Sequence, residues 1–559
     1  MSKNFGIEKF KGLLLAGSIS VVIEFLMGFS DSIVAGNLLG EQALSGVNLM
    51  SPVMTLVTFF AAMVGVGMSI NYSLSSGHLD QNRAWQFFTQ GVWTVLMGGT
   101  ALVTLLVLGR ETYFGFMGAS AEVADLSRAY WKYYVPSALL EPIVILLVNA
   151  NYVDGDSRRC IVTYVIQVVV NVGVSVLSVK CGMGLGGCSF GTLVANVVAA
   201  LILASHFFSK SNSFRLRRHF SLADTGRILA VAFGDSSSFL CSAVLFLLLN
   251  KFAIVHYGSG ILPVIGVVTS TLGFLEIFNG VSTALSPIVS VYVGEGNTKA
   301  VRLMMRYAMR VSILEALALS ALLAAFPGLV VGLVGISEPE LVREARLAVR
   351  MVSVGFVFTS LLTLFNSYYL FIERIGLAVA LTFLGGLVAQ AALVPTLGLL
   401  GTKGLYAALA FAPALAMLLF AGFLRLRYGR ELFPLLIPVL RDAKIRMFDL
   451  TLTEREIVDV SRAVGAVPGV PARAALMTEE VLMAVRDRNA GRVVLGEVTL
   501  DLNDGVKLTL RDDGEIFDIT DSDQCVSSLR SFLVASDMER QRTKMNLVTT
   551  GFNRNVFRF

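Results

Sequence analysis

Asn149-Ala-Asn-Tyr152 and Asn366-Ser-Tyr-Tyr369 are two versions of one short sequence, and they stand 217 residues apart in the chain. The same offset relates Gly118-Ala-Ser120 to Gly335-Ile-Ser337. Three more glycines recur at this spacing, namely Gly77, Gly184 and Gly187 at Gly294, Gly401 and Gly404. Long apolar segments surround all of these positions. A tandem repeat in such a chain predicts two homologous membrane bundles, the usual architecture of a secondary transporter.

The composition also indicates an integral membrane protein. The chain has 559 residues, 55% of them hydrophobic, and a mean hydropathy of +0.72, well above the range of soluble proteins. Apolar segments near the length needed to cross hydrocarbon predict twelve spans. We place them at 12–35, 44–72, 88–109, 130–150, 160–180, 187–208, 229–256, 262–292, 311–335, 348–371, 377–399 and 404–424.

The repeat groups these spans, because its offset maps spans 2 to 6 onto spans 8 to 12. We therefore predict a polytopic α-helical membrane protein with 12 transmembrane helices in two parallel six-helix repeats, since an even number of crossings brings both halves in from the same side. The predicted domains are an N-lobe at 1–215, a C-lobe at 216–440 and a soluble domain at 441–559.

Lysine and arginine are concentrated in the loops on one side of these spans, which predicts that this side is cytoplasmic and carries both termini. The net charge of +5 reflects that topology and says little about acidic partners. The first apolar segment has the length of a span and no cleavage site follows it, so we expect it to stay in the membrane. Five cysteines do not suggest a disulfide framework; Cys181 and Cys188 are the one conceivable pair, with packed thiols as the alternative.

Beyond about residue 445 the sequence is charged and mixed, as in a soluble α+β domain. Thr453-Glu-Arg-Glu456 has the spacing of a helix-capping box, and 472–488 reads as a second helix. Two alternating apolar runs, 498–502 and 506–510, flank Asn503-Asp-Gly505, which predicts a β-hairpin.

Carboxylates inside apolar spans are candidates for function, because an ionised group in hydrocarbon is costly unless it faces a cavity or a partner. Asp31 lies among small residues in span 1, where protons and metal ions could compete for it; an interfacial Asp capped by Ser30 or Ser32 is the alternative. Glu24 lies two helical turns earlier on the same face and would extend a carboxylate track, unless it only bonds a neighbouring span. Glu276, near the middle of span 8, is the corresponding candidate of the second half.

Neutral oxygens occur in the neighbouring spans. Asn171, Ser175 and Thr192 could complete a hard-cation site around a carboxylate, although each alone is also a common interhelical hydrogen bonder. We assign Asn149 and Asn366, the matched asparagines of the repeat, to the substrate cavity together with Glu24 and Glu276.

The two-times-six layout and several local sequences resemble the MATE (multidrug and toxic compound extrusion) exporters of the MOP superfamily over roughly residues 10–430. The residues that carry the resemblance are Phe29-Ser-Asp31-Ser-Ile-Val-Ala-Gly36 with Gly40, Ala43-Leu44 and Pro52, and Gly77 and Gly294 at the start of two cytoplasmic loops. The resemblance implies two lobes that rock about a central cavity and expel organic cations in exchange for Na⁺ or H⁺.

The resemblance also implies roles for single residues. Asp31 matches the N-lobe cation carboxylate of the family, and Asn171 and Thr192 match the polar residues around it, where Na⁺ would bind. Ser175 stands where many members have a second Asp, and span 7 lacks the carboxylate that some members use.

The tail resembles a GHKL-type ATP-binding domain of the anti-sigma-factor kind. Thr478-Glu-Glu480-Val-Leu-Met-Ala484 is similar to the N-box helix, and Asp512-Asp513-Gly514 to the Asp-x-Gly turn that reads adenine, which would make Glu480, Asp513 and Gly514 nucleotide-binding residues. However, Ala484 stands in place of the Mg²⁺-binding Asn, and Ser522-Asp-Gln-Cys525 and Arg540-Gln-Arg-Thr-Lys544 lack the lid glycines. A regulatory or protein-binding module that keeps the fold is therefore the favoured interpretation.

Taken together, the sequence predicts a cation-coupled antiporter and not an enzyme, with no cofactor beyond the coupling ion. Its expected partners are a small cationic or amphipathic substrate, the bilayer and a regulatory protein at the tail, with no nucleic acid, and we expect a monomer. A lipid-linked precursor flippase would instead have a basic cavity, whereas the mid-span charges are acidic. A membrane sensor with the tail as its output is the other alternative.

Overall fold

The computed structural model describes residues 4–77, 80–154, 156–209, 212, 214–294, 297–372, 374–429, 445–502, 505–515, 533–541 and 550–559, without the side chains of 15–28 and a few other positions. The chain forms two compact units. One contains Ser18–Gly280 and Val311–Arg427, and the other contains Met1–Gly17, Val281–Arg310 and Tyr428–Phe559.

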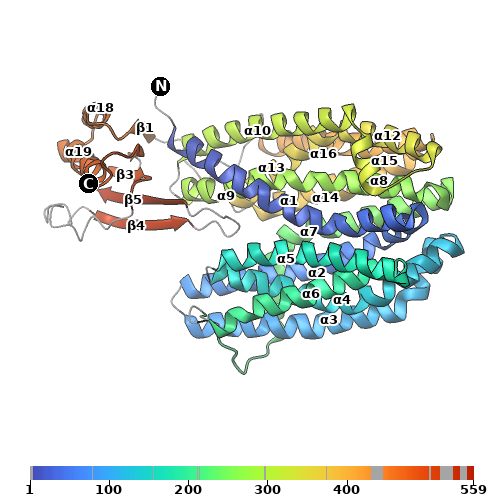
Figure 1. Cartoon of the computed structure of the whole chain (residues 1–559). Helices are drawn as coiled ribbons and strands as arrows, with labels where there is room; N and C mark the ends of the chain where they lie inside the picture. Colours follow the sequence, from blue (N-terminus) through green and yellow to red (C-terminus); the bar gives the residue numbers. More distant parts are fainter. Residues whose placement is uncertain are drawn as a thin grey trace. The chain divides into compact units, whose positions relative to one another are not determined.

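Most of the helices form two bundles in the first unit, whereas the helical residues 5–17, 281–294 and 298–310 belong to the second unit (Figure 1). The N-terminal bundle is formed by α1 (Phe5–Leu39), α2 (Glu41–Gly77), α3 (Gln81–Met117), α4 (Ala121–Val153), α5 (Ser157–Ser178) and α6 (Gly186–Ala204). Single turns of other helix types, Val179–Met183 and Ser205–Phe208, follow α5 and α6. The core of this bundle is apolar and aromatic, with Trp131 and Tyr134 among its fully packed side chains.

The C-terminal bundle has more breaks in its helices. It comprises α7 (Leu222–Tyr257), α8 (Leu262–Gly273), α9 (Asn279–Gly294), α10 (Thr298–Ala325), α11 (Gly328–Val334), α12 (Pro339–Ser353), α13 (Phe356–Phe371), α14 (Ile375–Phe383), α15 (Ala389–Gly398) and α16 (Thr402–Tyr428). The 3₁₀ turns Ser259–Ile261 and Phe274–Phe278 flank α8, and the π-helical turn Leu384–Val388 joins α14 to α15.

The described residues contain ten helices that are long and apolar enough to cross a membrane, or eleven if the bent pair α12 and α13 is one span. The remaining predicted span, 12–35, falls on α1, whose side chains at 15–28 lie outside the described residues. The predicted limits 311–335 are wrong: α10 starts at Thr298 and ends at Ala325, and α11 is separate. Phe326 and Pro327 break the helix there, because proline cannot donate a backbone hydrogen bond.

The repeated glycines have the same structural role in both bundles. Gly118 ends α3 with φ 69°, and Gly335 ends α11 with φ 81°. Gly184 and Gly401 also have positive φ, a conformation that favours glycine. A Cβ at Gly404 would lie 1.9 Å from the Leu397 carbonyl oxygen. The repeat therefore preserves positions at which the backbone requires glycine.

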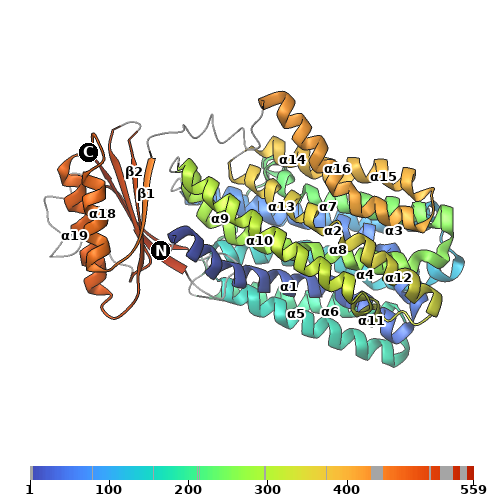
Figure 2. The ribbon, with the colours of Figure 1, turned by 90° about the horizontal axis from the view of Figure 1, so that it is seen from above.

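The C-terminal domain is an antiparallel five-stranded sheet in the order β1-β2-β3-β5-β4. Its elements are β1 (Ile445–Thr451), α18 (Glu454–Gly465), α19 (Ala472–Arg488), β2 (Leu495–Asp501), β3 (Lys507–Asp512), β4 (Leu533–Gln541) and β5 (Thr550–Arg558). The helices lie on one face of the sheet (Figure 2). The predicted helices and the pairing of β2 with β3 are confirmed; two residues of the predicted turn, 503 and 504, lie outside the described part.

Both faces of strands β2 and β3 are buried. Val498 and Leu510 face the helices and join their apolar core. Glu497 and Arg511 alternate with these residues, form an ion pair and are 0% and 1% exposed. The Tyr292 hydroxyl, at the end of α9, donates to the Glu497 carboxylate at 2.6 Å. The second face of the sheet is thus covered by helix ends of the same unit.

The start of α1 also packs in this unit. The Asp449 carboxylate on β1 accepts the Phe5 backbone N–H at 3.0 Å and the Asn4 amide at 2.8 Å, so it caps the first turn of α1. Lys9 pairs with Asp513 at 3.2 Å, and Lys299 on α10 donates to the Ile445 carbonyl at 2.7 Å. These contacts tie the domain to the starts of α1 and α10.

Candidate functional site

Asp31 lies inside the N-terminal bundle and is 4% exposed. Its Oδ2 accepts a hydrogen bond from the Tyr130 hydroxyl on α4 at 2.5 Å and one from the Thr192 hydroxyl on α6 at 3.0 Å. Three helices therefore meet at one carboxylate. A buried carboxylate held only by neutral donors is not charge-balanced, and a proton or a monovalent cation would neutralise it.

A second layer of hydrogen bonds fixes this arrangement. The Asn171 amide on α5 donates to the Thr192 hydroxyl at 2.9 Å, and the Ser30 hydroxyl donates to the Asn171 carbonyl oxygen at 2.6 Å. Asp31 Oδ1 accepts no hydrogen bond of normal geometry from the side chains that the structure describes. One carboxylate oxygen is thus available to a ligand, with hydroxyl and amide oxygens close by, which are ligands that hard cations prefer.

Of the four residues that we predicted to form the ion site, the structure brings Asp31, Asn171 and Thr192 together. The Ser175 hydroxyl donates to the Cys188 carbonyl oxygen at 3.2 Å and not to Asp31; the Thr192 hydroxyl approaches the same carbonyl oxygen at 3.4 Å, so Ser175 lies beside the group. Tyr130 was missed. The cluster of aromatic residues at 130–134 marks it as a packed residue, and nothing in the sequence shows that its hydroxyl reaches α1.

A further carboxylate that we did not assign to the site lies along α4. Glu141 accepts a hydrogen bond from the Thr58 hydroxyl on α2 at 2.6 Å. Tyr134 lies on the same helix between Tyr130 and Glu141; it is 1% exposed, its ring stacks on that of Tyr130, and its hydroxyl has no hydrogen-bond partner among the described residues. One face of α4 therefore presents polar groups from Tyr130 to Glu141.

The residues assigned to the substrate cavity lie apart from this cluster. Glu276 is exposed although protein surrounds it on most sides, and Asn279 donates to it at 2.5 Å. Asn149 donates to the Ile145 carbonyl of its own helix, and Asn366 accepts from Thr382 at 3.2 Å. The side chain of Glu24 lies outside the described residues. Glu276 is therefore an exposed carboxylate in the 3₁₀ turn between α8 and α9, with Asn279 as a hydrogen-bond partner.

The two bundles are in contact at the end of α1. A Cβ on Gly36 would lie 1.6 Å from the Val334 carbonyl oxygen, so the two backbones touch. Asn37 donates to the Leu333 carbonyl at 2.7 Å, and Glu41 accepts the backbone N–H groups of Ser337 and Glu338 at 2.7 and 2.6 Å. We call this contact, 36–41 against 333–338, the closed end.

Polar contacts deeper between the bundles support the closed end. The buried amides of Asn48 on α2 and Asn250 on α7 bond to each other at 2.9 Å, and Thr269 on α8 donates to Asn48 at 3.0 Å. Phe29 on α1 also packs against Phe274 of the C-terminal bundle. Because α1 contributes Asp31 to one bundle and contacts the other, a change at the carboxylate can affect the contact between them.

The three residues of the C-terminal domain that we assigned to a nucleotide have other contacts or lie elsewhere. Asp513 accepts the Leu495 backbone N–H at 2.7 Å and pairs with Lys9. A Cβ at Gly514 would lie 2.7 Å from the Asn489 amide, so this turn is tightly packed. Glu480 is half-buried on α19. No group of three or more His, Cys, Asp or Glu side chains with metal-binding geometry occurs in the described part of the chain.

Comparisons with known proteins agree with this architecture. The MatE family profile matches twice, at residues 18–177 and 237–396. The probable multidrug resistance protein NorM of Thermotoga maritima is 23% identical over 346 residues, covering 60% of this chain and 73% of that protein. The multidrug export protein MepA of Staphylococcus saprophyticus is 22% identical over 291 residues, covering 51% of this chain and 63% of that protein.

A solved structure has the same fold. The inward-facing conformation of a multidrug resistance MATE family transporter of the MOP superfamily superimposes with a TM-score of 0.67 at 22% identity, covering 72% of this chain and 94% of that one. The two profile matches confirm the internal repeat that the glycines predicted.

Proposed function

The chain belongs to the MatE family of secondary transporters, and from this premise we propose that it is an antiporter that exports organic cations or drug-like compounds in exchange for Na⁺ or H⁺. The two relatives are described as a probable multidrug resistance protein and a multidrug export protein, which supports drug-like compounds as the substrate class. The solvent-accessible carboxylate of Glu276, placed in an apolar helix, is suited to a cationic substrate.

The observation that carries the coupling proposal is the Asp31 cluster. A carboxylate buried among Tyr130, Thr192 and Asn171 binds a proton or Na⁺ in place of a fixed counter-charge. Loss of that cation leaves an uncompensated charge in an apolar bundle, which favours a rearrangement of α1. One charge moved across 100 mV supplies about 2.3 kcal/mol, enough to drive substantial accumulation.

Transport requires two states of the bundles that bind cation and substrate differently. We propose that the two lobes rock about the cavity and that the closed end faces the outside, with both termini in the cytoplasm. The higher density of Lys and Arg in loops on the side of the termini supports this orientation. Release of the contact between Gly36 and Val334 would then open the outer side.

The C-terminal domain is proposed to be a regulatory module descended from a GHKL-type ATP-binding fold. Its contacts with the starts of α1 and α10 support regulation, because α1 is the helix that carries Asp31. Asp513 is engaged by Lys9 and by the Leu495 backbone, which argues against a role in nucleotide binding. A regulatory protein or a small ligand that competes for these contacts would change the restraint on α1.

Efflux of a fluorescent lipophilic cation from proteoliposomes tests the antiport. Imposed Na⁺ and H⁺ gradients are compared for the intact chain, for Asp31→Asn and for Asp125→Asn, a control carboxylate whose side chain is 74% exposed. We expect one gradient to drive transport, Asp31→Asn to abolish it and Asp125→Asn to retain it. Gradient-driven transport that survives in Asp31→Asn would contradict the assigned coupling site, and no transport under either gradient by folded protein would contradict the antiporter.

A further inference from the structure

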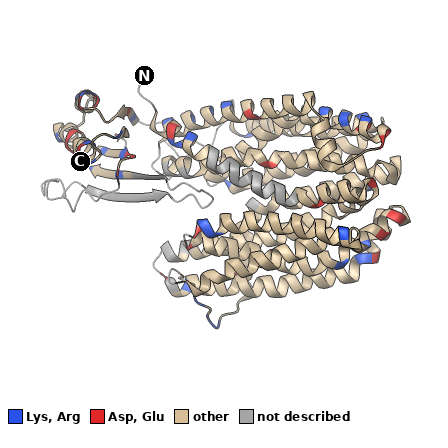
Figure 3. Cartoon of the chain, viewed as in Figure 1, with Lys and Arg blue, Asp and Glu red and all other residues tan. Residues whose placement is uncertain are grey.

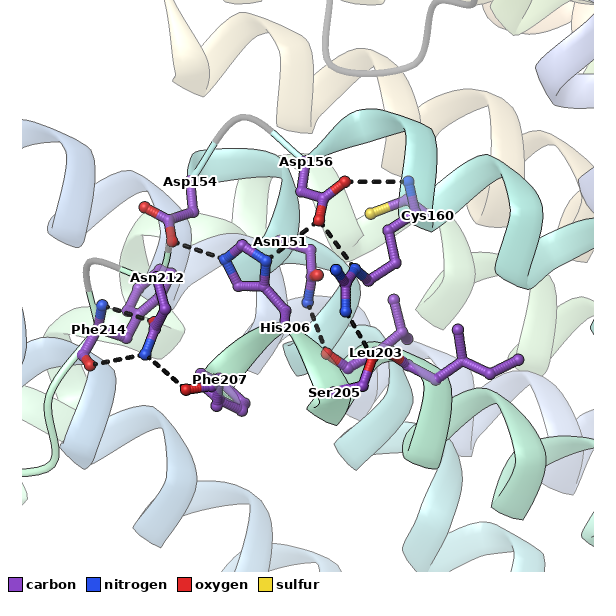
Figure 4. A network of polar contacts seen from close by, with 12 residues as sticks. Asn151, Asp154, Asp156, Cys160, Leu203, Ser205, His206, Phe207, Asn212 and Phe214 are labelled. Atoms are coloured by element: carbon purple, nitrogen blue, oxygen red, sulfur yellow. Dashed lines mark hydrogen bonds and ion pairs between the residues drawn. The ribbon is translucent and has the colours of Figure 1, made fainter. Parts of the chain in front are cut away.

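The linker between the two bundles, residues 209–221, starts from a tightly bonded turn. His206 is 0% exposed and lies between two carboxylates, with Nε2 at 2.7 Å from Asp154 and Nδ1 at 3.2 Å from Asp156 (Figure 4). Asn212 then donates to the Phe207 carbonyl at 3.1 Å and accepts the Phe214 backbone N–H at 2.9 Å. These contacts fix the first part of the linker to the N-terminal bundle.

The rest of the linker is fixed as well. Phe214 is 5% exposed and packs between Tyr72 and Phe88, with ring centroids 4.6 Å from each. The Arg217 backbone N–H donates to the Thr89 hydroxyl at 2.9 Å, and that of Ser221 donates to Gln90 at 2.8 Å. These contacts hold the described residues Phe214, Arg217 and Ser221 against the N-terminal bundle, and the Arg217 guanidinium also donates to Asn82 on α3 at 3.3 Å.

The exposed side chains in the linker and directly beside it are large and apolar or basic. Phe208 is 92% exposed, Leu216 68% and Leu222 75%. Phe208 ends a helix that is long and apolar enough to cross a membrane, whereas the apolar span of α7 begins only at Ser236. We therefore expect the segment from Phe208 to Leu222 to lie near the membrane surface. Apolar side chains at that level are stable in contact with lipid, whereas in water they would form an unfavourable patch.

Three arginines alternate with these apolar residues. Arg215, Arg217 and Arg218 are exposed, and the described part of the chain places no carboxylate within ion-pair distance of them. The guanidinium groups of Arg215 and Arg217 lie 5.2 and 4.7 Å from the ring centroid of Trp85. Nearby Arg83, in contrast, pairs with Asp224 at 2.6 Å. Figure 3 shows the linker as a loop with basic residues at the lower edge of the helical bundles.

We propose that this linker is a binding site for anionic phospholipid, with lipid phosphates at Arg215, Arg217 and Arg218 and acyl chains against Phe208 and Leu216. The charge of the arginines is complementary to a phosphate, and planar guanidinium groups bind phosphate oxygens in pairs. The apolar neighbours favour a lipid over soluble phosphate, which would leave them in water. The proposal rests on the membrane location of the family and not on the transport cycle proposed above.

A lipid bound at this site would also restrain the N-terminal bundle. The linker connects α6 to α7, and a lipid bound to it would hold the adjoining end of the N-terminal bundle at the level of the headgroups. An arginine near an anionic membrane surface contributes about 1 kcal/mol of binding free energy, so each arginine of the site raises the affinity for anionic lipid about fivefold.

Trp85 offers a local test, because it lies under two of the arginines. A variant with Trp93→Phe and Trp131→Phe leaves it as the one tryptophan of the chain. The protein is reconstituted with increasing mole fractions of phosphatidylglycerol or phosphatidylcholine brominated near the headgroup end of the acyl chains, and quenching of Trp85 fluorescence is measured at each mole fraction. Arg217→Gln with Arg218→Gln removes charge at the site, and Arg425→Gln with Arg427→Gln removes the same charge at exposed residues of α16.

We expect the anionic lipid to quench Trp85 at severalfold lower mole fraction than the zwitterionic lipid, and this preference to disappear in the linker variant and to remain in the α16 variant. Equal quenching by both lipids would overturn the proposal. An unchanged preference in the linker variant, or an equal loss in both variants, would also overturn it, since the effect would then be general charge attraction. The readout needs no transport, so it is independent of whether Asp31 couples an ion.

Discussion

The substitution Gly36→Ala tests the backbone contact at the closed end. The added Cβ would lie 1.6 Å from the Val334 carbonyl oxygen and 2.8 Å from its carbon. Because Cβ contacts under 3.0 Å do not occur, α1 and the turn after α11 must separate by at least about 1.4 Å. Both neighbours are backbone, so no side-chain rotation relieves the overlap.

That separation breaks the hydrogen bonds that depend on the contact. They are the bond from Asn37 to the Leu333 carbonyl and the two backbone donors to Glu41, from Ser337 and Glu338. At about 1 kcal/mol for each bond at an exposed site, the closed end loses roughly 3 kcal/mol, which is about a hundredfold in the equilibrium between closed and open states. We therefore expect Gly36→Ala to shift the population toward an open end.

Distances between spin labels measure this shift directly. Cysteines that replace the exposed residues Glu122 and Glu340, in a background without the native cysteines, place one label on each bundle. Gly12→Ala is the matched control on the same helix, because nothing lies within 4 Å of its Cβ. We expect a longer or bimodal distance in Gly36→Ala and an unchanged one in Gly12→Ala. Identical distance distributions in the two variants would refute the reasoning.

Three other substitutions test separate contacts. Tyr130→Phe removes one of the two donors to Asp31 but keeps the ring, so we expect coupled transport to persist with a shifted dependence on the concentration of the coupling ion; an unchanged dependence would contradict the contact. Tyr292→Phe removes one of the donors to the buried Glu497 carboxylate, at a cost of about 1–3 kcal/mol, so the C-terminal domain should be cleaved faster in limited proteolysis of the full chain. Burial raises the pKa of Asp512 from 3.8 to about 7, against the bonds from Asn553 and Gly514. The stability that this group contributes is therefore fully present below pH 3.8 and is lost as pH rises through 7, by up to about 4 kcal/mol. Burial raises the pKa of Glu497 to about 8, so this group acts in the same direction, and Asp512→Asn should reduce but not abolish the loss of proteolytic resistance between pH 5 and pH 8. An unchanged loss in this variant would contradict the role of Asp512.

Backbone conformations with positive φ were predictable from the sequence, because few residue types can adopt them. The positive φ at Gly118 and Gly335 explains why glycine recurs there, and the repeat of such positions gave the two-bundle architecture. The lengths of the apolar segments predicted the spans for a similar reason. Within hydrocarbon, a single segment can satisfy its backbone hydrogen bonds only as a helix. The limits of α10 were missed, because its first turns are basic and lie before the apolar run.

Contacts between side chains of different helices were harder to predict. Asp31, Asn171 and Thr192 were identified by residue type and resemblance, whereas the position of Tyr130 depends on how α4 is rotated about its axis. Ser175 was assigned to the same site, and its hydroxyl bonds the Cys188 carbonyl oxygen of α6 rather than Asp31. The buried pair of Glu497 and Arg511 was also missed, since charged residues on a strand normally indicate a face in water.

The ion cluster belongs to one bundle, and this asymmetry bears on mechanism. At the repeat offset of 217, Tyr130, Asn171 and Thr192 correspond to Leu347, Val388 and Leu409, which carry no polar group. The part of α7 from Ser236 to Tyr257 contains neither Asp nor Glu. The repeat thus keeps the backbone of both bundles, whereas the polar side chains around Asp31 belong to the first bundle alone. In the antiport proposed above, exchange of a cation at Asp31 would change the net charge of the first bundle at this site, so the two bundles would respond differently to the same ion. A difference of this kind is what allows a single buried carboxylate to bias the contact between two bundles of the same fold.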